Sequence, residues 1–132
     1  MGKRGSGKTK QIIELVNQAA ADDPGSVVCV EKGQKLRYDV KSAARLIDIS
    51  EYPVRGYNGV LGFVCGIYAE NYDVNQIFLD SLYKISEDSD IEHAEAFLDV
   101  LAGFAETHGV TVTITISDDI ENATEGIKRF IT

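Results

Sequence analysis

The sequence lacks the features that mark membrane, secreted and metal-cluster proteins. Of its 132 residues 44% are apolar, but no run approaches the ~18 consecutive apolar residues of a membrane-spanning helix. The N-terminus has no apolar signal-peptide core. Only two cysteines occur, Cys29 and Cys65, both in apolar runs, and no Cys/His group has metal-ligand spacing. We therefore expect a cytoplasmic protein with reduced, buried thiols and no contact with a membrane.

Basic residues are also scarce, since 13 bases against 21 acids give a net charge of −8. Four of these bases lie in the first ten residues, which hold no acid: Lys3, Arg4, Lys8 and Lys10. A short basic segment on an otherwise acidic protein suits a small polyanion such as a nucleotide. A nucleic acid would need an extended basic face. We expect a nucleotide ligand and no nucleic-acid partner.

The basic N-terminus contains a phosphate-binding motif. Residues 2–9 read G-K-R-G-S-G-K-T and fit G-x-x-x-x-G-K-[ST], the pattern known as Walker A. Its glycines let backbone N–H groups approach phosphates and form an anion nest at a helix start. The expected nucleotide-binding positions are Gly2, Gly5, Ser6, Gly7, Lys8 and Thr9. Lys8 would reach the β- and γ-phosphates and the Thr9 hydroxyl would bind Mg²⁺; the alternative is a glycine-rich turn that merely begins a helix.

One element of such a site is missing from the sequence. A buried strand leads into a phosphate-binding loop, but only Met1 precedes Gly2. Three explanations are open. The start of the sequence was placed at an internal methionine, or the chain is a fragment, or another segment takes the place of the strand. We expect one nucleotide-binding domain over residues 1–132, truncated at its N-terminus or started late. A missing central strand would leave two neighbours with unpaired backbone groups.

Apolar periodicity predicts a chain that alternates helices and strands. Helices are expected over residues 8–21, 40–44, 57–70, from a cap at Ser89 to His108, and over 120–131. Strands are expected over residues 26–31, 35–38, 46–49 and 110–116, and a strand that ends at Asp80 is expected within residues 76–82. The turn at Gly33 makes the first two strands a hairpin, and Gly109 is the expected C-cap of the helix before it. His93 is predicted to lie at the surface.

Residues 76–82 (Q-I-F-L-D-S-L) form the second informative stretch. Three apolar residues run into Asp80, which is the form of Walker B, a buried strand that carries a carboxylate to its carboxyl end. That edge is where α/β sheets bind ligands. Asp80 would hold Mg²⁺ through a water, opposite Thr9. An apolar run that ends in aspartate is common, so a plain strand end is the alternative.

The two motifs and the order of the elements resemble the P-loop NTPases. Residues 78–82 (F-L-D-S-L) look like the Asp-Ser form of Walker B in RecA-like and KaiC-like ATPases. Most of the chain is similar to small stand-alone ATP-binding proteins often filed as PilT-like; true PilT motors carry further domains, so motility is not implied. The resemblance implies an α/β fold with three layers, α/β/α, and a mainly parallel sheet whose leading P-loop strand is missing. It also implies ATP and Mg²⁺ as cofactors.

The resemblance extends to residues for hydrolysis. Many of these ATPases place a glutamate directly after the Walker B aspartate, where this chain has Ser81. RecA-like members carry it at the end of the strand after the P-loop helix, where Glu31 stands; with Lys8 on the phosphates, Glu31 would orient the attacking water. A hairpin residue facing solvent is the alternative for Glu31. Ser117 stands at the position where RecA-like enzymes have a polar residue that senses the γ-phosphate.

No arginine is clearly an arginine finger, and Arg45, Arg55 and Arg129 are candidates only by elimination. RecA-like ATPases often complete the site from a neighbouring subunit, so we expect weak or partner-dependent ATP hydrolysis, with a protein partner or a homo-oligomer. A small nucleotide or metabolite kinase is one alternative, although its candidate lid, residues 50–58, holds one arginine. A non-hydrolysing nucleotide-sensing or assembly module is the other. The sequence has no Asn-Lys-x-Asp pattern, which favours ATP over GTP.

Overall fold

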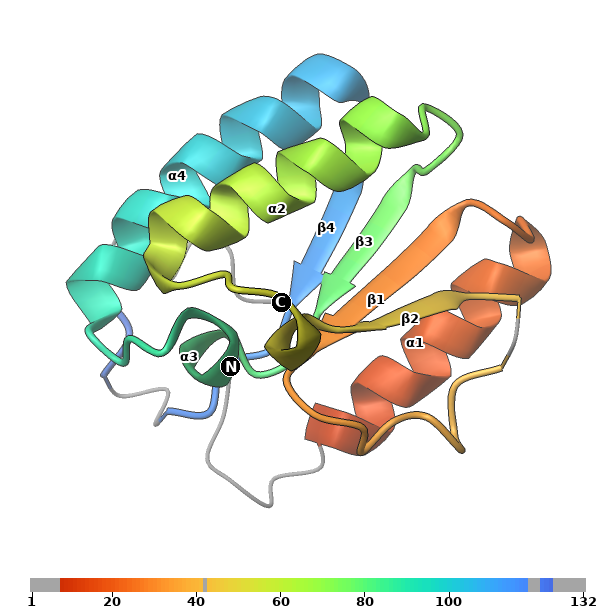
Figure 1. The fold of residues 1–132 in the computed structure, drawn as a ribbon, viewed down its shortest axis with the longest axis horizontal. Coiled ribbons are helices and arrows are strands. Elements are labelled where there is room, and N and C mark those ends of the chain that lie inside the picture. The colour runs from red at the N-terminus through yellow and green to blue at the C-terminus, as the bar shows by residue number, and fades with distance from the viewer. Residues whose placement is uncertain (1–7, 42, 119–121, 125–132) are drawn as a thin grey trace.

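The structure, a computed structural model, describes residues 8–41, 43–118 and 122–124 (Figure 1). Helices and strands alternate along most of the chain, as the sequence predicts. The helices are α1 (Lys8–Asp22), the 3₁₀ turn η1 (Ile49–Glu51), α2 (Gly56–Glu70), α3 (Leu82–Ser86) and α4 (Ile91–His108). The strands are β1 (Val27–Glu31), β2 (Arg45–Asp48), β3 (Gln76–Leu79) and β4 (Thr111–Ile114). The predicted α/β class is therefore confirmed.

The four strands form one sheet in the order β2-β1-β3-β4, and every neighbouring pair runs parallel. Strand β1 is buried along its whole length, which explains its continuous apolar sequence, since parallel strands are covered on both faces. The pairing is continuous from β2 to β4. No gap for a missing strand therefore lies between these four strands, and the expectation of two neighbours with unpaired backbone groups does not apply to them.

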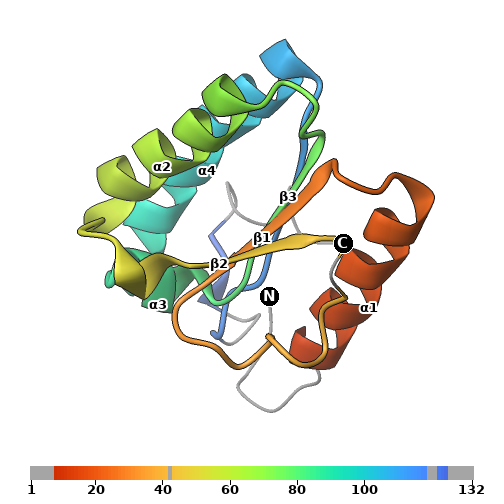
Figure 2. The same cartoon turned by 45° about the vertical axis from the view of Figure 1, so that its right-hand side comes forward.

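Helices cover both faces of this sheet (Figures 1 and 2). Helix α1 packs on one face, and α2, α3 and α4 pack on the other. Because side chains alternate along a strand, the sheet residues divide between the two cores. Those facing α1 are Val27, Cys29 and Phe78. Those facing the other helices are Val28, Val30, Ile47, Ile77 and Leu79.

The hairpin predicted over residues 26–38 is wrong. Both edges of β1 pair with parallel neighbours, so a strand returning from Gly33 has no edge on which to pair. The chain turns instead, and the N–H groups of Lys35 and Leu36 donate to the Glu31 carboxylate at 3.1 and 3.2 Å. Leu36 is fully buried in the core beside α1, and this burial holds the connection against the helix.

Three further differences concern the helices. The short helix predicted over residues 40–44 is not present at residues 40, 41, 43 and 44, where the chain turns. Asp90, not Ser89, caps α4, because its carboxylate accepts hydrogen bonds from the first N–H groups of that helix. Helix α3 has no predicted counterpart, because five residues carry too little periodicity. Gly109 is the C-cap of α4 as predicted, with φ of 68°. The helix predicted over residues 120–131 lies almost wholly outside the described residues.

Candidate functional site

The carboxyl ends of β1 and β3 form a topological switch point. From β1 the chain crosses the α1 face to reach β2 on one side, because the connection packs Leu36 and Val40 beside α1. From β3 it crosses the opposite face, through α3 and α4, to reach β4 on the other side. Open α/β sheets bind ligands outside the carboxyl ends of strands whose connections diverge in this way. The topology alone therefore places a candidate site at the ends of β1 and β3.

A row of polar side chains crosses the sheet at this edge. Asp48 of β2 pairs with Glu31 of β1. Val30 pairs with Leu79 and Leu79 with Ile114, so the next residues along β1, β3 and β4 are Glu31, Asp80 and Thr115. The alternation of side chains places this row on the face that α1 covers. Glu31 and Asp80 are 1% and 2% exposed, so two carboxyl groups lie buried side by side.

The start of α1 lies at the same edge of the sheet. Only residues 23–26 separate α1 from β1, so the helix runs back along the sheet and begins where the strands end (Figure 1). Lys8 is half-buried and Thr9 is exposed in its first turn. The structure thus brings Lys8 and Thr9 to the edge that carries Glu31 and Asp80. The other predicted nucleotide-binding positions, Gly2, Gly5, Ser6 and Gly7, lie outside the described residues.

The Asp80 carboxylate is bound through only one of its oxygens. Its Oδ1 accepts a hydrogen bond of 2.8 Å from the Thr115 hydroxyl. Its Oδ2 is buried and has no hydrogen-bond partner in the part of the chain that the structure describes. Leaving such a group unpaired in the interior is costly. A cation or its bound water would satisfy Oδ2, and carboxylate oxygens are the ligands that Mg²⁺ prefers. The site therefore fits the predicted role of Asp80.

Glu31 is a buried residue that binds the following turn, so the alternative of a hairpin residue facing solvent is wrong. Burial raises the pKa of the Glu31 carboxyl, and the charge of Asp80 adds to this rise. The N–H groups of Leu36 and Lys35 oppose it by stabilising the carboxylate. Burial also raises the pKa of the neighbouring Cys29 thiol to about 12, and Asp80 and Glu31 add to that effect. Cys29 therefore stays protonated, and both it and the half-buried Cys65 are free thiols.

The structure places two of the three candidate arginine fingers. Arg45 begins β2, at the edge of the sheet opposite to Glu31 and Asp80, so it cannot serve as a finger for this site within the same chain. Arg55 is exposed, and its Nη1 lies 3.8 Å from Glu87 Oε2. Arg129 lies outside the described residues. Ser117 follows β4 at the carboxyl edge and is half-buried, which leaves its sensor role a prediction.

Sequence reasoning missed Thr115. It belongs to a run in which valine or isoleucine alternates with threonine, a pattern that indicates a strand without telling which neighbour its hydroxyls meet. The structure shows that Thr115 Oγ1 binds both Asp80 Oδ1 and the Ser81 N–H, each at 2.8 Å. Only the order of the strands, with β4 beside β3, places these groups together.

No protein-family model matches the chain, and no curated protein is significantly similar to it. In the described ranges no group of three or more His, Cys, Asp or Glu side chains could hold a metal ion. A cation at Asp80 would therefore take most of its ligands from elsewhere, as Mg²⁺ commonly does from nucleotide phosphates and waters. None of the helices that the structure describes is long and apolar enough to cross a bilayer.

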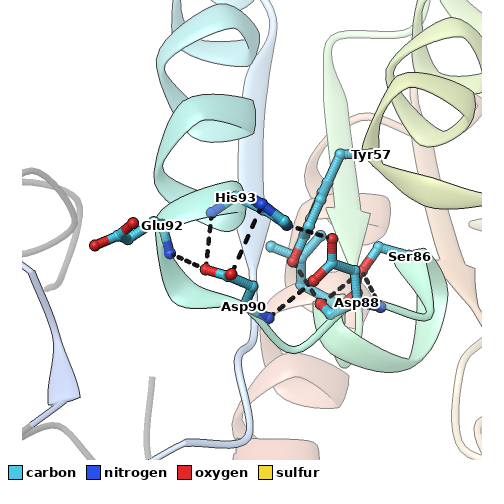
Figure 3. A network of polar contacts seen from close by, with 7 residues as sticks. Tyr57, Ser86, Asp88, Asp90, Glu92 and His93 are labelled. Carbon is cyan, nitrogen blue, oxygen red and sulfur yellow. Dashed lines mark hydrogen bonds and ion pairs between the residues drawn. The ribbon is translucent and has the colours of Figure 1, made fainter.

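A second polar network joins α2, α3 and α4 (Figure 3). The Tyr57 hydroxyl and the Ser86 hydroxyl both donate to the carbonyl of Asp88, at 2.8 and 3.1 Å. The Asp88 carboxylate accepts from the Asp90 N–H at 2.9 Å and lies 2.7 Å from Nδ1 of His93. His93 is exposed, as predicted. The network thus fixes the entry into α4, and it holds a histidine between two carboxylates.

We expect His93 to make the stability of the fold depend on pH. Hydrogen bonding to Asp88 raises the pKa of His93 above 6.5, and the charges of Asp88, Asp90 and Glu92 add to the rise. Stability from the protonated ring is therefore fully present below pH ~6.5 and is lost as pH rises through the higher pKa of the folded state. Thermal unfolding of wild type and His93→Gln should differ at pH 6 and converge at high pH. A difference that does not change with pH would contradict this.

Proposed function

We propose that this protein binds Mg-ATP at the carboxyl ends of β1 and β3 and hydrolyses it slowly or only with a partner. The observation that carries the proposal is Asp80 Oδ2, a buried carboxylate oxygen without a partner among the described residues. It lies at the switch point of the sheet, at the edge where α1 begins. Residues 2–9, which lead into α1, read as a phosphate-binding loop. Motif and topology therefore indicate the same edge of the sheet.

Each residue has a distinct part in this proposal. The N–H groups at the start of α1 and the Lys8 ammonium bind the phosphates. The Thr9 hydroxyl would hold Mg²⁺, and Asp80 would hold it through a water. Mg²⁺ at this place would supply positive charge to neutralise the negative charge that develops on the phosphates. The burial of Asp80 strengthens its attraction for the cation, because charges interact more strongly away from water.

Glu31 is the residue that we propose for orienting the attacking water. Its two oxygens accept from Lys35 and Leu36, which fixes the carboxylate in place. A carboxylate has about four lone-pair positions, so two N–H donors leave room for a water. The raised pKa of Glu31 makes its carboxylate a better proton acceptor than an exposed glutamate. As the water oxygen bonds to the γ-phosphorus and the bond from that phosphorus to the ADP oxygen breaks, the proton of the water would pass to this carboxylate.

Replacing Glu31 by glutamine tests hydrolysis separately from binding. We expect steady-state phosphate release to fall by about 100-fold or more, the range for loss of a general base, while the affinity for Mg-ATP stays within a few-fold. The variant should also lose about 1 kcal/mol of stability, because the amide retains only one acceptor for two N–H groups. Glu70→Gln, an exposed substitution at the end of α2, is the control. Wild-type turnover in Glu31→Gln would show that Glu31 only anchors the turn.

A second candidate function is nucleotide sensing or assembly without hydrolysis. Two observations favour it: both Glu31 oxygens already bind the backbone, and Ser81 stands where an acid could follow Asp80. Under this alternative, saturating Mg-ATP would bind and stabilise the protein, but phosphate release would not exceed that of Lys8→Ala. Measuring binding and phosphate release on the same preparation therefore separates the two functions.

A further inference from the structure

Thr115 occupies an unusual position between two groups of the neighbouring strand. Its own N–H donates to the Leu79 carbonyl at 3.0 Å, and its carbonyl accepts from the Leu82 N–H at 2.9 Å. These bonds fix the Thr115 backbone on both sides of Asp80 and Ser81. The side chain is β-branched, so its first torsion angle is restricted as well. The Thr115 hydroxyl is therefore held in place before any ligand arrives.

The direction of each hydrogen bond follows from the donors present. The Ser81 N–H can only donate, so Thr115 Oγ1 accepts from it at 2.8 Å. The single hydroxyl hydrogen is then left for Asp80 Oδ1, at 2.8 Å. Asp80 Oδ1 must accept this hydrogen, which leaves Oδ2 as the oxygen without a partner among the described residues. Thr115 thus decides which of the two carboxylate oxygens is available.

The hydrogen bond to Thr115 also stabilises an unfavourable backbone conformation at Ser81. Its φ of 63° lies in the left-handed region, which is unfavourable for a residue other than glycine. The hydrogen bond from its N–H to Thr115 stabilises the sharp turn that joins β3 to α3. Without that turn the Asp80 side chain would not stay fixed, because rotation of a carboxylate about its last torsion is soft. One hydroxyl group therefore holds both the backbone and the side chain of the strand end.

We propose that Thr115 is a positioning residue that presents Asp80 Oδ2 to the cation that accompanies a bound nucleotide. This inference rests on the proposed function and assigns to β4 a part in the site. Residues that orient a metal ligand typically change metal affinity by 10–100-fold when they are removed. Loss of the hydroxyl should therefore weaken the contribution of Mg²⁺ to binding while the contacts to the phosphates remain.

The test compares ATP affinity with Mg²⁺ and with EDTA, by calorimetric titration of the full chain. The ratio of the two dissociation constants measures the coupling between cation and nucleotide. In Thr115→Val, which keeps the shape of the side chain, we expect this ratio to fall by about 10-fold, with the affinity in EDTA unchanged. Thr115→Ser keeps the hydroxyl and should restore the ratio to within about 3-fold of wild type. Thr113→Val, two residues earlier on the same strand face, is the control.

The outcomes separate this inference from the function on which it rests. If wild type does not bind ATP under either condition, the proposed function fails, and the role of Thr115 fails with it. If wild type shows coupling and Thr115→Val shows the same ratio, only the role of Thr115 is overturned. Equal losses with Mg²⁺ and with EDTA would show a structural role and also overturn it. If Thr115→Val does not fold, Thr115→Ala provides a second variant without the hydroxyl.

Discussion

Replacing Lys8 by alanine is expected to abolish the stabilisation of the protein by Mg-ATP. A ligand at 100 times its dissociation constant stabilises the native state by about 2.7 kcal/mol. For a chain of this length that gain corresponds to a rise in melting temperature of roughly 10 °C. Lys8 begins α1 at the edge that carries Asp80, where its ammonium and the helix dipole would attract phosphate together. Calorimetry or a dye-based melting assay with and without Mg-ATP measures the effect.

The control for this experiment is Lys10→Ala. Lys10 is exposed two residues further along α1, so its loss changes the net charge equally without removing the motif lysine. It should retain nearly all of the stabilisation by Mg-ATP. A shift that survives in Lys8→Ala would place the nucleotide elsewhere. The absence of any shift in wild type, at every ATP concentration, would refute both candidate functions.

Elements with their own periodicity could be predicted from the sequence. The apolar face of residues 8–21 predicts α1, and the continuous run that ends at Glu31 predicts a strand buried on both faces. The first pattern reflects one buried face of α1, formed by Ile12, Val16 and Ala20, and the second reflects burial along the whole of β1. The same applies to β3, whose apolar residues lead directly into Asp80. Local sequence therefore identified both central strands and the two acidic groups at their ends.

The features that could not be predicted from the sequence depend on which strands are neighbours in the sheet. A turn after Glu31 followed by a short polar stretch suits a hairpin, but β2 and β3 occupy both edges of β1. The role of Thr115 depends in the same way on β4 lying beside β3. The cap of α4 shows a smaller limit, because Ser89 and Asp90 are adjacent and both suit an N-cap. Only the backbone geometry selects Asp90.

Asp48 and Asp80 lie on either side of Glu31 in the same polar row, but they differ in their hydrogen-bond partners. Asp48 accepts hydrogen bonds from the Gly33 N–H at 2.8 Å and from the Ser50 N–H and hydroxyl at 3.0 and 2.6 Å. Burial opposes ionisation of Asp48, but these bonds outweigh it and lower its pKa. Asp80 has one such bond and a buried oxygen without a partner among the described residues. Asp48 therefore stabilises the fold, whereas Asp80 costs it stability.

This contrast predicts that Asp80→Asn stabilises the protein without ligand, by about 1–3 kcal/mol, because burying a neutral amide costs less than burying a carboxylate. The amide oxygen can still accept from Thr115, and the neutral NH₂ takes the place of Oδ2, the carboxylate oxygen that has no partner among the described residues. The matched substitution Asp48→Asn should have the opposite sign, because it weakens three existing hydrogen bonds. Chemical denaturation of both variants measures the two effects.

The same Asp80→Asn variant should lose the dependence of ATP binding on Mg²⁺, because a neutral amide is a much poorer partner for the cation than a carboxylate. A gain in stability together with a loss of cation coupling is characteristic of a residue retained for a site and not for the fold. If Asp80→Asn destabilises the protein as much as Asp48→Asn does, the Asp80 carboxylate is satisfied in the native state and the assignment of Oδ2 to a cation is wrong. A stabilised variant with unchanged coupling would instead leave Asp80 as a strand end without a part in binding.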